Sequence, residues 1–311
     1  MWYIYIKQGG VKVESIVLKE NNDLQLKKHL QNFLDYIDVS PKTMETYRIA
    51  LNQFINYLYS RNIKNPVRED IIEFREEIKQ RLKPTTVNSY LIAIRNLYNY
   101  LEYEGITKNI AKNIKGIKLE QRHLKRGLSV EEIHDVLNFC KDLRERLIIK
   151  LMISCGLRVN EVVNIQLEDF YDDKGVTMLR VLGKGRDGLK QDSVKIDDRL
   201  LDLIREYIRE YKVNDYLFVS TSNHNNGGKV TGKTIRYIVT NIFKKANLDM
   251  EQLSPHSTRH STCELLLEQG MPIQEVSEFM RHKNIQTTLI YSKQLDKRNC
   301  KATNIISDLI F

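Results

Sequence analysis

The chain has 311 residues, which is enough for one large or two ordinary domains. Its 49 lysines and arginines outnumber its 40 aspartates and glutamates, and the net charge of +9 favours a polyanionic partner on one face. The four cysteines lack paired metal spacing, and no apolar run reaches the length of a membrane span. Composition therefore argues against a disulfide scaffold and a membrane protein, and we expect a soluble, cytoplasmic one.

The N-terminal third of the chain predicts a helical domain. Residues 1–20 alternate in polarity around Gly9-Gly10 and predict a short β-hairpin of unknown role. Residues 21–115 then carry apolar side chains at helical spacing. Helices are predicted from Leu26 to Ile37 and over 43–59, 70–81 and 85–104. The second of these follows Ser40-Pro41, which supplies a capping serine and a proline at the helix start.

Polar and basic side chains lie between these apolar stripes. They are candidates for contacts with nucleic-acid phosphates, although simple solvation is the better explanation for most of them. The candidates are Lys42, Thr43, Arg48, Thr85, Thr86, Asn88 and Arg95.

Residues 116–127 are rich in lysine and arginine and predict a linker, which either follows a DNA backbone or is a plain connector. A second domain, 128–311, opens with Ser129 and Glu132 in capping-box spacing. Helices are predicted over 130–139, 144–154, 200–211 and 231–246, and strands over 175–182 and 189–196. The helix over 231–246 is a candidate for the DNA major groove, and the basic residues at its start are Lys229, Lys233 and Arg236. For any single one of these lysines, a solvated basic face is the better explanation.

The stretch from Ser254 to Tyr291 contains an unusual set of polar residues. His256 and Arg259 are one helical turn apart, His282 follows a helical apolar pattern, and Tyr291 comes nine residues later. An arginine binds two phosphate oxygens, histidines donate hydrogen bonds, and a tyrosine oxygen can attack phosphorus. The set therefore indicates phosphoryl-transfer chemistry.

A metal site at the same place is the alternative. His256 and His260 have the spacing of a zinc-protease helix, but that chemistry needs a glutamate where Ser257 stands. Arg259 would also place a fixed cation beside the metal. We therefore predict no metal and assign His260 to the support of the core.

The 254–291 stretch resembles the C-terminal signature of the tyrosine recombinases, the phage integrase family. That signature is His-x-x-Arg, then a histidine that closes a Leu-Gly-His-like turn, then a tyrosine nine residues later. The turn here reads Met280-Arg281-His282, with Arg281 in place of the usual glycine. Residues 155–162 resemble the family's first arginine motif, which contains Arg158, and residues 183–186 resemble its β-hairpin lysine, Lys184.

The resemblance implies a mainly α protein with a small antiparallel β-sheet, in which a helical core-binding domain precedes a mixed α/β catalytic domain. It implies a site-specific recombinase that cleaves and rejoins DNA through a 3′-phosphotyrosyl intermediate, without metal, ATP or another cofactor. Glu161 is expected to position the active-site residues and not to take part in the chemistry itself. The implied roles of Arg158 and Arg259 are to bind the non-bridging oxygens of the scissile phosphate, to which His282 donates a hydrogen bond. Tyr291 would attack the phosphorus, His256 would assist proton transfer, and Lys184 would protonate the leaving 5′ oxygen.

The implied partners are double-stranded DNA with paired recombination sites, in the nucleoid, and further copies of the chain in a DNA-bound tetramer. The apolar tail Ile305–Phe311 would join the copies, or would pack on its own domain. Two other functions remain open: a type IB-like topoisomerase, and a non-catalytic sequence-specific DNA-binding protein.

Overall fold

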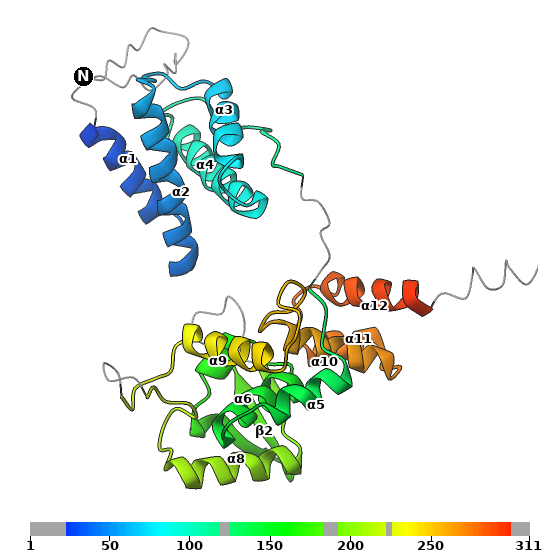
Figure 1. The fold of residues 1–311 in the computed structure, drawn as a ribbon. Coiled ribbons are helices and arrows are strands. Elements are labelled where there is room, and N and C mark those ends of the chain that lie inside the picture. Colours follow the sequence, from blue (N-terminus) through cyan, green and yellow to red (C-terminus); the bar gives the residue numbers. More distant parts are fainter. Residues whose placement is uncertain (1–22, 119–124, 183–191, 222–225, 300–311) are drawn as a thin grey trace, which may run out of the picture. The chain divides into compact units, whose positions relative to one another are not determined.

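The computed structural model describes residues 23–118, 125–182, 192–221 and 226–299 (Figure 1). The predicted hairpin over 1–20, the turn that carries Lys184 and the tail 305–311 lie outside the described residues. The chain divides into two compact units, residues 1–122 and residues 123–311. Along the described part, no helix is long and apolar enough to cross a lipid bilayer.

The first unit is helical. Its described elements are α1 (Asp23–Tyr36), α2 (Pro41–Ser60), α3 (Arg68–Lys79) and α4 (Pro84–Tyr103). The predicted start of α2 is confirmed, because the Thr43 amide donates to Ser40 Oγ at 3.3 Å and Pro41 occupies the first turn. Apolar residues of α2, α3 and α4, such as Leu51, Phe74 and Ile94, are fully buried and form one core.

The second unit combines helices with a small sheet. Strands β1 (Phe170–Asp173), β2 (Val176–Val181) and β3 (Asp192–Lys195) pair antiparallel in that order, with Leu179 opposite both Phe170 and Val194. The helices are α5 (Val130–Asn138), α6 (Leu143–Ser154), α7 (Val159–Val163), the 3₁₀ turn η1 (Leu167–Asp169), α8 (Asp198–Tyr211), α9 (Gly232–Lys245), α10 (Ser257–Glu268), α11 (Ile273–Phe279) and α12 (Gln286–Asn299).

The sequence pattern identified β2 and β3 but not β1. The sequence of β1 is Phe-Tyr-Asp-Asp, and its acidic half has low strand propensity. β1 lies at an edge of the sheet, and Asp172 and Asp173 are exposed there. Pairing with β2, and not local propensity, makes this segment a strand.

Helix α6 lies at the centre of the second unit and packs against α7, α8, α9 and α10. It is buried on most sides, because Leu147, Ile148 and Leu151 are all inaccessible to solvent. Cys155 caps its C-terminus, and Gly156 follows with φ +57°, the left-handed conformation in which a glycine commonly terminates a helix. A side chain at Gly156 would meet Met280 Sδ at 2.9 Å, so glycine permits this turn to approach the turn after α11.

Candidate active site

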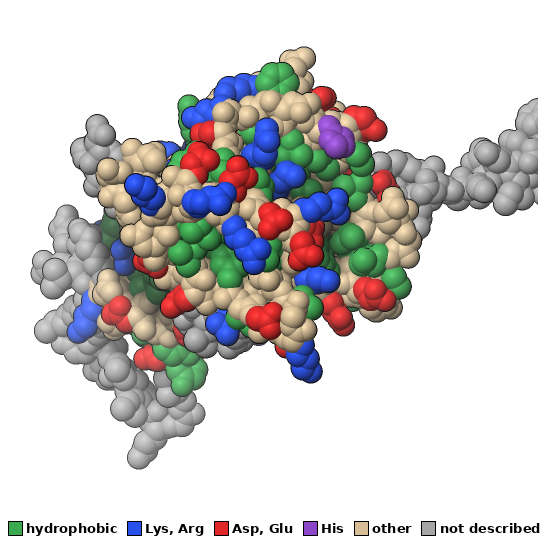
Figure 2. Space-filling model, turned by 90° about the horizontal axis from the view of Figure 1, so that it is seen from below, with side chains coloured by type: hydrophobic (Ala, Val, Ile, Leu, Met, Phe, Trp, Pro, Cys, Tyr) green, Lys and Arg blue, Asp and Glu red, His purple; other side chains and the backbone are tan. Residues whose placement is uncertain are grey.

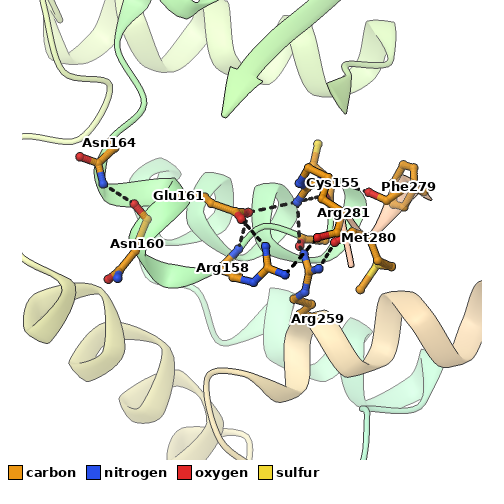
Figure 3. A network of polar contacts seen from close by, with 10 residues as sticks. Cys155, Arg158, Asn160, Glu161, Asn164, Arg259, Phe279, Met280 and Arg281 are labelled. Carbon is orange, nitrogen blue, oxygen red and sulfur yellow. Dashed lines mark hydrogen bonds and ion pairs between the residues drawn. The ribbon is translucent and has the colours of Figure 1, made fainter. Parts of the chain in front are cut away.

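Arg158 stands at the start of α7 and is held there by Glu161. The Arg158 amide donates to Glu161 Oε2 at 2.9 Å, and its Nη1 donates to Oε1 at 2.6 Å (Figure 3). Glu161 is 3% exposed and Arg158 is 25% exposed. One buried carboxylate therefore fixes both the backbone and the guanidinium of Arg158, as expected from their spacing of three residues.

Arg259 lies in the first turn of α10 and is 2% exposed. Its Nη1 donates to the carbonyl of Gly156, and its Nη2 donates to the carbonyl of Met280 (Figure 3). These two carbonyls end α6 and α11. Arg259 therefore lies where the end of α6 and the end of α11 meet the start of α10.

The turn after α11 carries His282. The His282 amide donates to the Ser277 carbonyl at 3.0 Å, and the Arg281 amide donates to the Glu278 carbonyl at 2.8 Å. This pair of bonds is a Schellman motif, and Arg281 adopts φ +53° within it. Arg281 thus keeps the left-handed backbone that a glycine would take. The imidazole of His282 is oriented by Thr288, whose buried Oγ1 lies 2.8 Å from Nδ1.

Tyr291 lies on α12 and packs against α10. Its hydroxyl is hydrogen-bonded to Nδ1 of His260, and the two rings are 5.2 Å apart between centroids. His260 in turn meets His256 edge-on, at 4.7 Å between centroids. His256 itself is exposed at the start of α10. The structure therefore places the predicted nucleophile beside the helix that carries His256 and Arg259.

Two features of this cluster favour binding of an anion. The guanidinium groups of Arg158 and Arg281 both bind the single carboxylate of Glu161, and the buried guanidinium of Arg259 adds a third positive charge to the cluster (Figure 3). Burial, with the charges of Arg158 and Arg281, lowers the pKa of the Arg259 guanidinium to about 9. Arg259 is thus still charged at neutral pH, and the excess of positive charge is not offset within the cluster.

Three groups of the cluster, His260, His282 and Tyr291, are neutral at pH 7. Burial, then the neighbouring cations, lowers the pKa of His282 to about 4. Burial and the charge of His256 lower the pKa of His260 to about 3. Burial raises the pKa of the Tyr291 hydroxyl, so this hydroxyl keeps its proton until a reaction removes it.

Five of the six predicted catalytic residues come from α7, α10, the turn after α11, and α12, and Lys184 lies outside the described residues. Sequence reasoning missed the contact of His260 with Tyr291, the Thr288 partner of His282 and the side-chain role of Arg281. The arginine in a glycine position was the one local signal available for the last of these.

The predicted DNA contacts differ in their exposure and in the protein groups that they already bind. Lys42, Arg48, Thr85, Lys233 and Arg236 are exposed, and Thr43 and Thr86 are half-buried. Lys229 contacts Asn164 and the ring of Tyr216. On the face drawn in Figure 2, basic side chains are interspersed with acidic ones.

Asn88 and Arg95 already hold the end of their own unit. Asn88 pairs with both backbone groups of Ile117, at 2.9 Å and 2.7 Å, and Arg95 donates to the Ile114 carbonyl at 2.9 Å. Arg95 therefore fixes the segment before the predicted linker, and Asn88 fixes the second residue of the linker itself.

Known proteins match both units. Residues 126–298 match the phage integrase family, and residues 30–105 match the phage integrase N-terminal SAM-like domain. The chain belongs to the phage integrase family.

Two curated relatives cover nearly all of the chain. The tyrosine recombinase XerA of Pyrococcus furiosus is 30% identical over 291 residues, which is 90% of this chain and 96% of the relative. The XerA of Pyrococcus horikoshii is 29% identical over 284 residues, which is 90% of this chain and 94% of the relative. This family member is a tyrosine-type site-specific recombinase, as the sequence predicted, and the relatives do not favour a topoisomerase or a non-catalytic protein.

Solved structures show the same fold. XerH site-specific recombinase in a post-cleavage complex with palindromic difH substrate aligns with a TM-score of 0.72 at 23% identity, over 94% of this chain and 91% of that one. A lambda integrase dimer bound to a COC′ core site aligns with a TM-score of 0.68 at 15% identity, over 84% and 96% of the two chains. The predicted fold class is therefore confirmed.

Proposed function

We propose that Tyr291 is the nucleophile of this recombinase and that Arg158, Arg259, His256, His282 and Lys184 serve the same phosphate. The observation that carries the proposal is the contact between α12 and α10. The Tyr291 hydroxyl reaches the residue that follows Arg259, so an attacking oxygen lies beside the arginine cluster.

The proposed reaction exchanges one phosphodiester for another. The Tyr291 oxygen bonds to phosphorus as its proton leaves, and the bond from phosphorus to the 5′ oxygen breaks. Arg158 and Arg259 stabilise the charge on the non-bridging oxygens, because each guanidinium is a fixed two-point donor. Lys184 protonates the leaving 5′ oxygen, and His256 assists proton transfer. The 3′-phosphotyrosyl bond conserves the energy of the ester, so rejoining needs neither ATP nor a metal.

A nicked DNA substrate tests the nucleophile. Cleavage close to a nick releases a short fragment, so the covalent intermediate accumulates and is seen as a protein–DNA band under denaturing conditions. Tyr291→Phe keeps the ring but removes the attacking oxygen, so it should bind DNA and form no adduct. Tyr237→Phe, at an exposed tyrosine of α9, is the matched control and should form the adduct normally. Adduct formation by Tyr291→Phe would place the nucleophile elsewhere.

The proposed division of labour follows the domains. Residues 21–115 act as a core-binding domain and residues 128–311 as the catalytic domain, with 116–127 as the basic connection between them. Exposed Lys42, Arg48, Lys233 and Arg236 are the proposed phosphate contacts. Because its proposed substrate is DNA with paired recombination sites, we expect the protein to act in the nucleoid.

We further propose that the chain acts as a DNA-bound tetramer and that the tail 305–311 joins its copies. A lambda integrase tetramer bound to a Holliday junction shares the fold, with a TM-score of 0.67. A chain cut after Asn304 should bind one site and keep its melting temperature, yet fail to assemble paired sites. A lower melting temperature with tetramers intact would instead mean that the tail packs on its own domain.

A further inference from the structure

Arg281 occupies a position where a side chain is costly. Its φ of +53° lies in the left-handed region at the end of α11, where glycine is the usual residue. A non-glycine side chain is strained there, because its Cβ approaches the following carbonyl oxygen. The backbone of the turn does not need an arginine, since both Schellman bonds are made by main-chain groups. The side chain is the part of this residue that has to be explained.

The Arg281 side chain is 6% exposed, and its guanidinium binds the end of α6. Its Nη1 and Nη2 each donate to the Cys155 carbonyl at 3.3 Å, and Nη2 also donates to the Gly156 carbonyl at 3.2 Å. Carbonyls at a helix C-terminus lack intrahelical partners and attract a cation. Arg281 thus ties the turn after α11 to the end of the central helix (Figure 3).

The same guanidinium also binds the residue that holds Arg158. Arg281 Nη2 donates to Glu161 Oε2 at 3.0 Å, which is the oxygen that also accepts from the Arg158 amide. Glu161 Oε1 is left to Arg158 Nη1. A second contact links the two arginines directly: Arg158 Nη2 donates to the backbone carbonyl of Arg281 at 3.5 Å. The carboxylate is therefore held from both sides by two arginines (Figure 3).

The two arginines differ in what they leave available. The side chain of Arg281 is almost fully buried, and its terminal nitrogens all bind protein acceptors. The side chain of Arg158 is 25% exposed. Arg281 therefore faces the protein and Arg158 faces the site, with Glu161 between them.

We infer that Arg281 is a positioning residue of the active site. Its side chain fixes Glu161 relative to the turn that carries His282. Because Glu161 holds the Arg158 guanidinium, Arg281 also fixes the position of Arg158. A rigid link from α6 and α7 to this turn fixes two phosphate-binding groups relative to each other. The inference rests on the proposed function, since it assigns Arg158 and His282 to one phosphate.

Arg281→Gly is a sharp test because glycine suits the backbone. The variant should fold and bind DNA as the unaltered protein does, while single-turnover adduct formation falls about 10- to 100-fold through misplacement of Arg158. Lys212→Gly is the matched control: Lys212 ends α8 with φ +49° and is exposed, so this change should leave adduct formation unaltered.

A double-mutant cycle with Glu161→Gln separates positioning from general support of the fold. If Arg281 acts through Glu161, adding Arg281→Gly to Glu161→Gln should reduce the rate less than about twofold further. Equal losses in both backgrounds, or a normal rate in Arg281→Gly alone, would overturn the inference. Absence of any adduct with the unaltered protein would instead refute the proposed function, so the two failures are distinguishable.

Discussion

The hydroxyl of Tyr291 is hydrogen-bonded to Nδ1 of His260, the residue that follows Arg259 on α10. The sequence predicts only a core-supporting role for His260, whereas the structure places its ring against that of the proposed nucleophile. Burial holds His260 neutral and Tyr291 protonated, so the pair is an uncharged hydrogen bond. The contact fixes the ring of Tyr291 relative to the arginine cluster.

Replacing His260 should slow the reaction without weakening the binding of DNA. His260→Leu removes the partner of the Tyr291 hydroxyl, and a lost hydrogen bond of about 1 kcal/mol corresponds to roughly a fivefold change. We expect single-turnover adduct formation to fall by about that factor or more, with the dissociation constant for DNA unchanged. His134→Leu, at an exposed histidine of α5, is the control and should behave as the unaltered protein. A normal rate in His260→Leu would leave His260 with a core role alone.

The two site arginines should each be irreplaceable by lysine. Arg158→Lys and Arg259→Lys keep the charge but lose the planar two-point donor, so the transition state should suffer more than binding. Loss of one oriented donor costs roughly 10²–10³-fold in rate. Gel-based cleavage kinetics and a binding isotherm on the same DNA measure both quantities. Arg146→Lys, at an exposed position of α6, serves as the control. Near-normal cleavage by either site variant would make that arginine structural.

Thr288 should matter through His282. Thr288→Val preserves shape and burial but removes the Oγ1 that lies 2.8 Å from His282 Nδ1. The imidazole then loses the contact that sets its orientation, so we expect the cleavage rate to fall roughly tenfold while the melting temperature changes little. Thr287→Val, at the exposed neighbour, should have no effect on cleavage. If both variants cleave equally well, Thr288 does not orient the site.

Acidification should destabilise the catalytic unit. The pKa of His260 is about 3 and that of His282 about 4 in the folded chain, against an ordinary value of 6.5. Below pH 6.5 the unfolded chain binds protons that the folded chain does not, so this stability is complete above pH 6.5 and is lost as pH falls toward 4 and then 3. Burial is the main cause of the low pKa of His260, and the nearby charges of His256, Arg259 and His282 lower this pKa further.

The expected result is a melting temperature several degrees lower at pH 5 than at pH 7.5, since about 1 kcal/mol corresponds to roughly 2–4 °C in a unit of this size. Differential scanning calorimetry measures it. His260→Leu should show a smaller drop between the two pH values, because one of the titrating groups is gone. An equal drop in both proteins would assign the pH dependence to other groups.

Local signals explain what the sequence by itself determined. Helix starts at Ser40-Pro41 and Ser129 depend on side chains within one turn, so they are readable from neighbouring residues. The order and spacing of Arg158, Arg259, His282 and Tyr291 carried the resemblance that predicted them as site residues. The predicted membership in the phage integrase family is confirmed.

The tertiary structure decided the contacts between distant residues. Tyr291 meets His260 across 31 positions, and Arg281 meets Glu161 across 120. No local pattern specifies such pairs, because they exist only once α6, α10, α11 and α12 pack together. The acidic strand β1 likewise exists because β2 supplies its partner. For this protein, spacing predicted the proposed reacting residues, and packing decided what holds them in place.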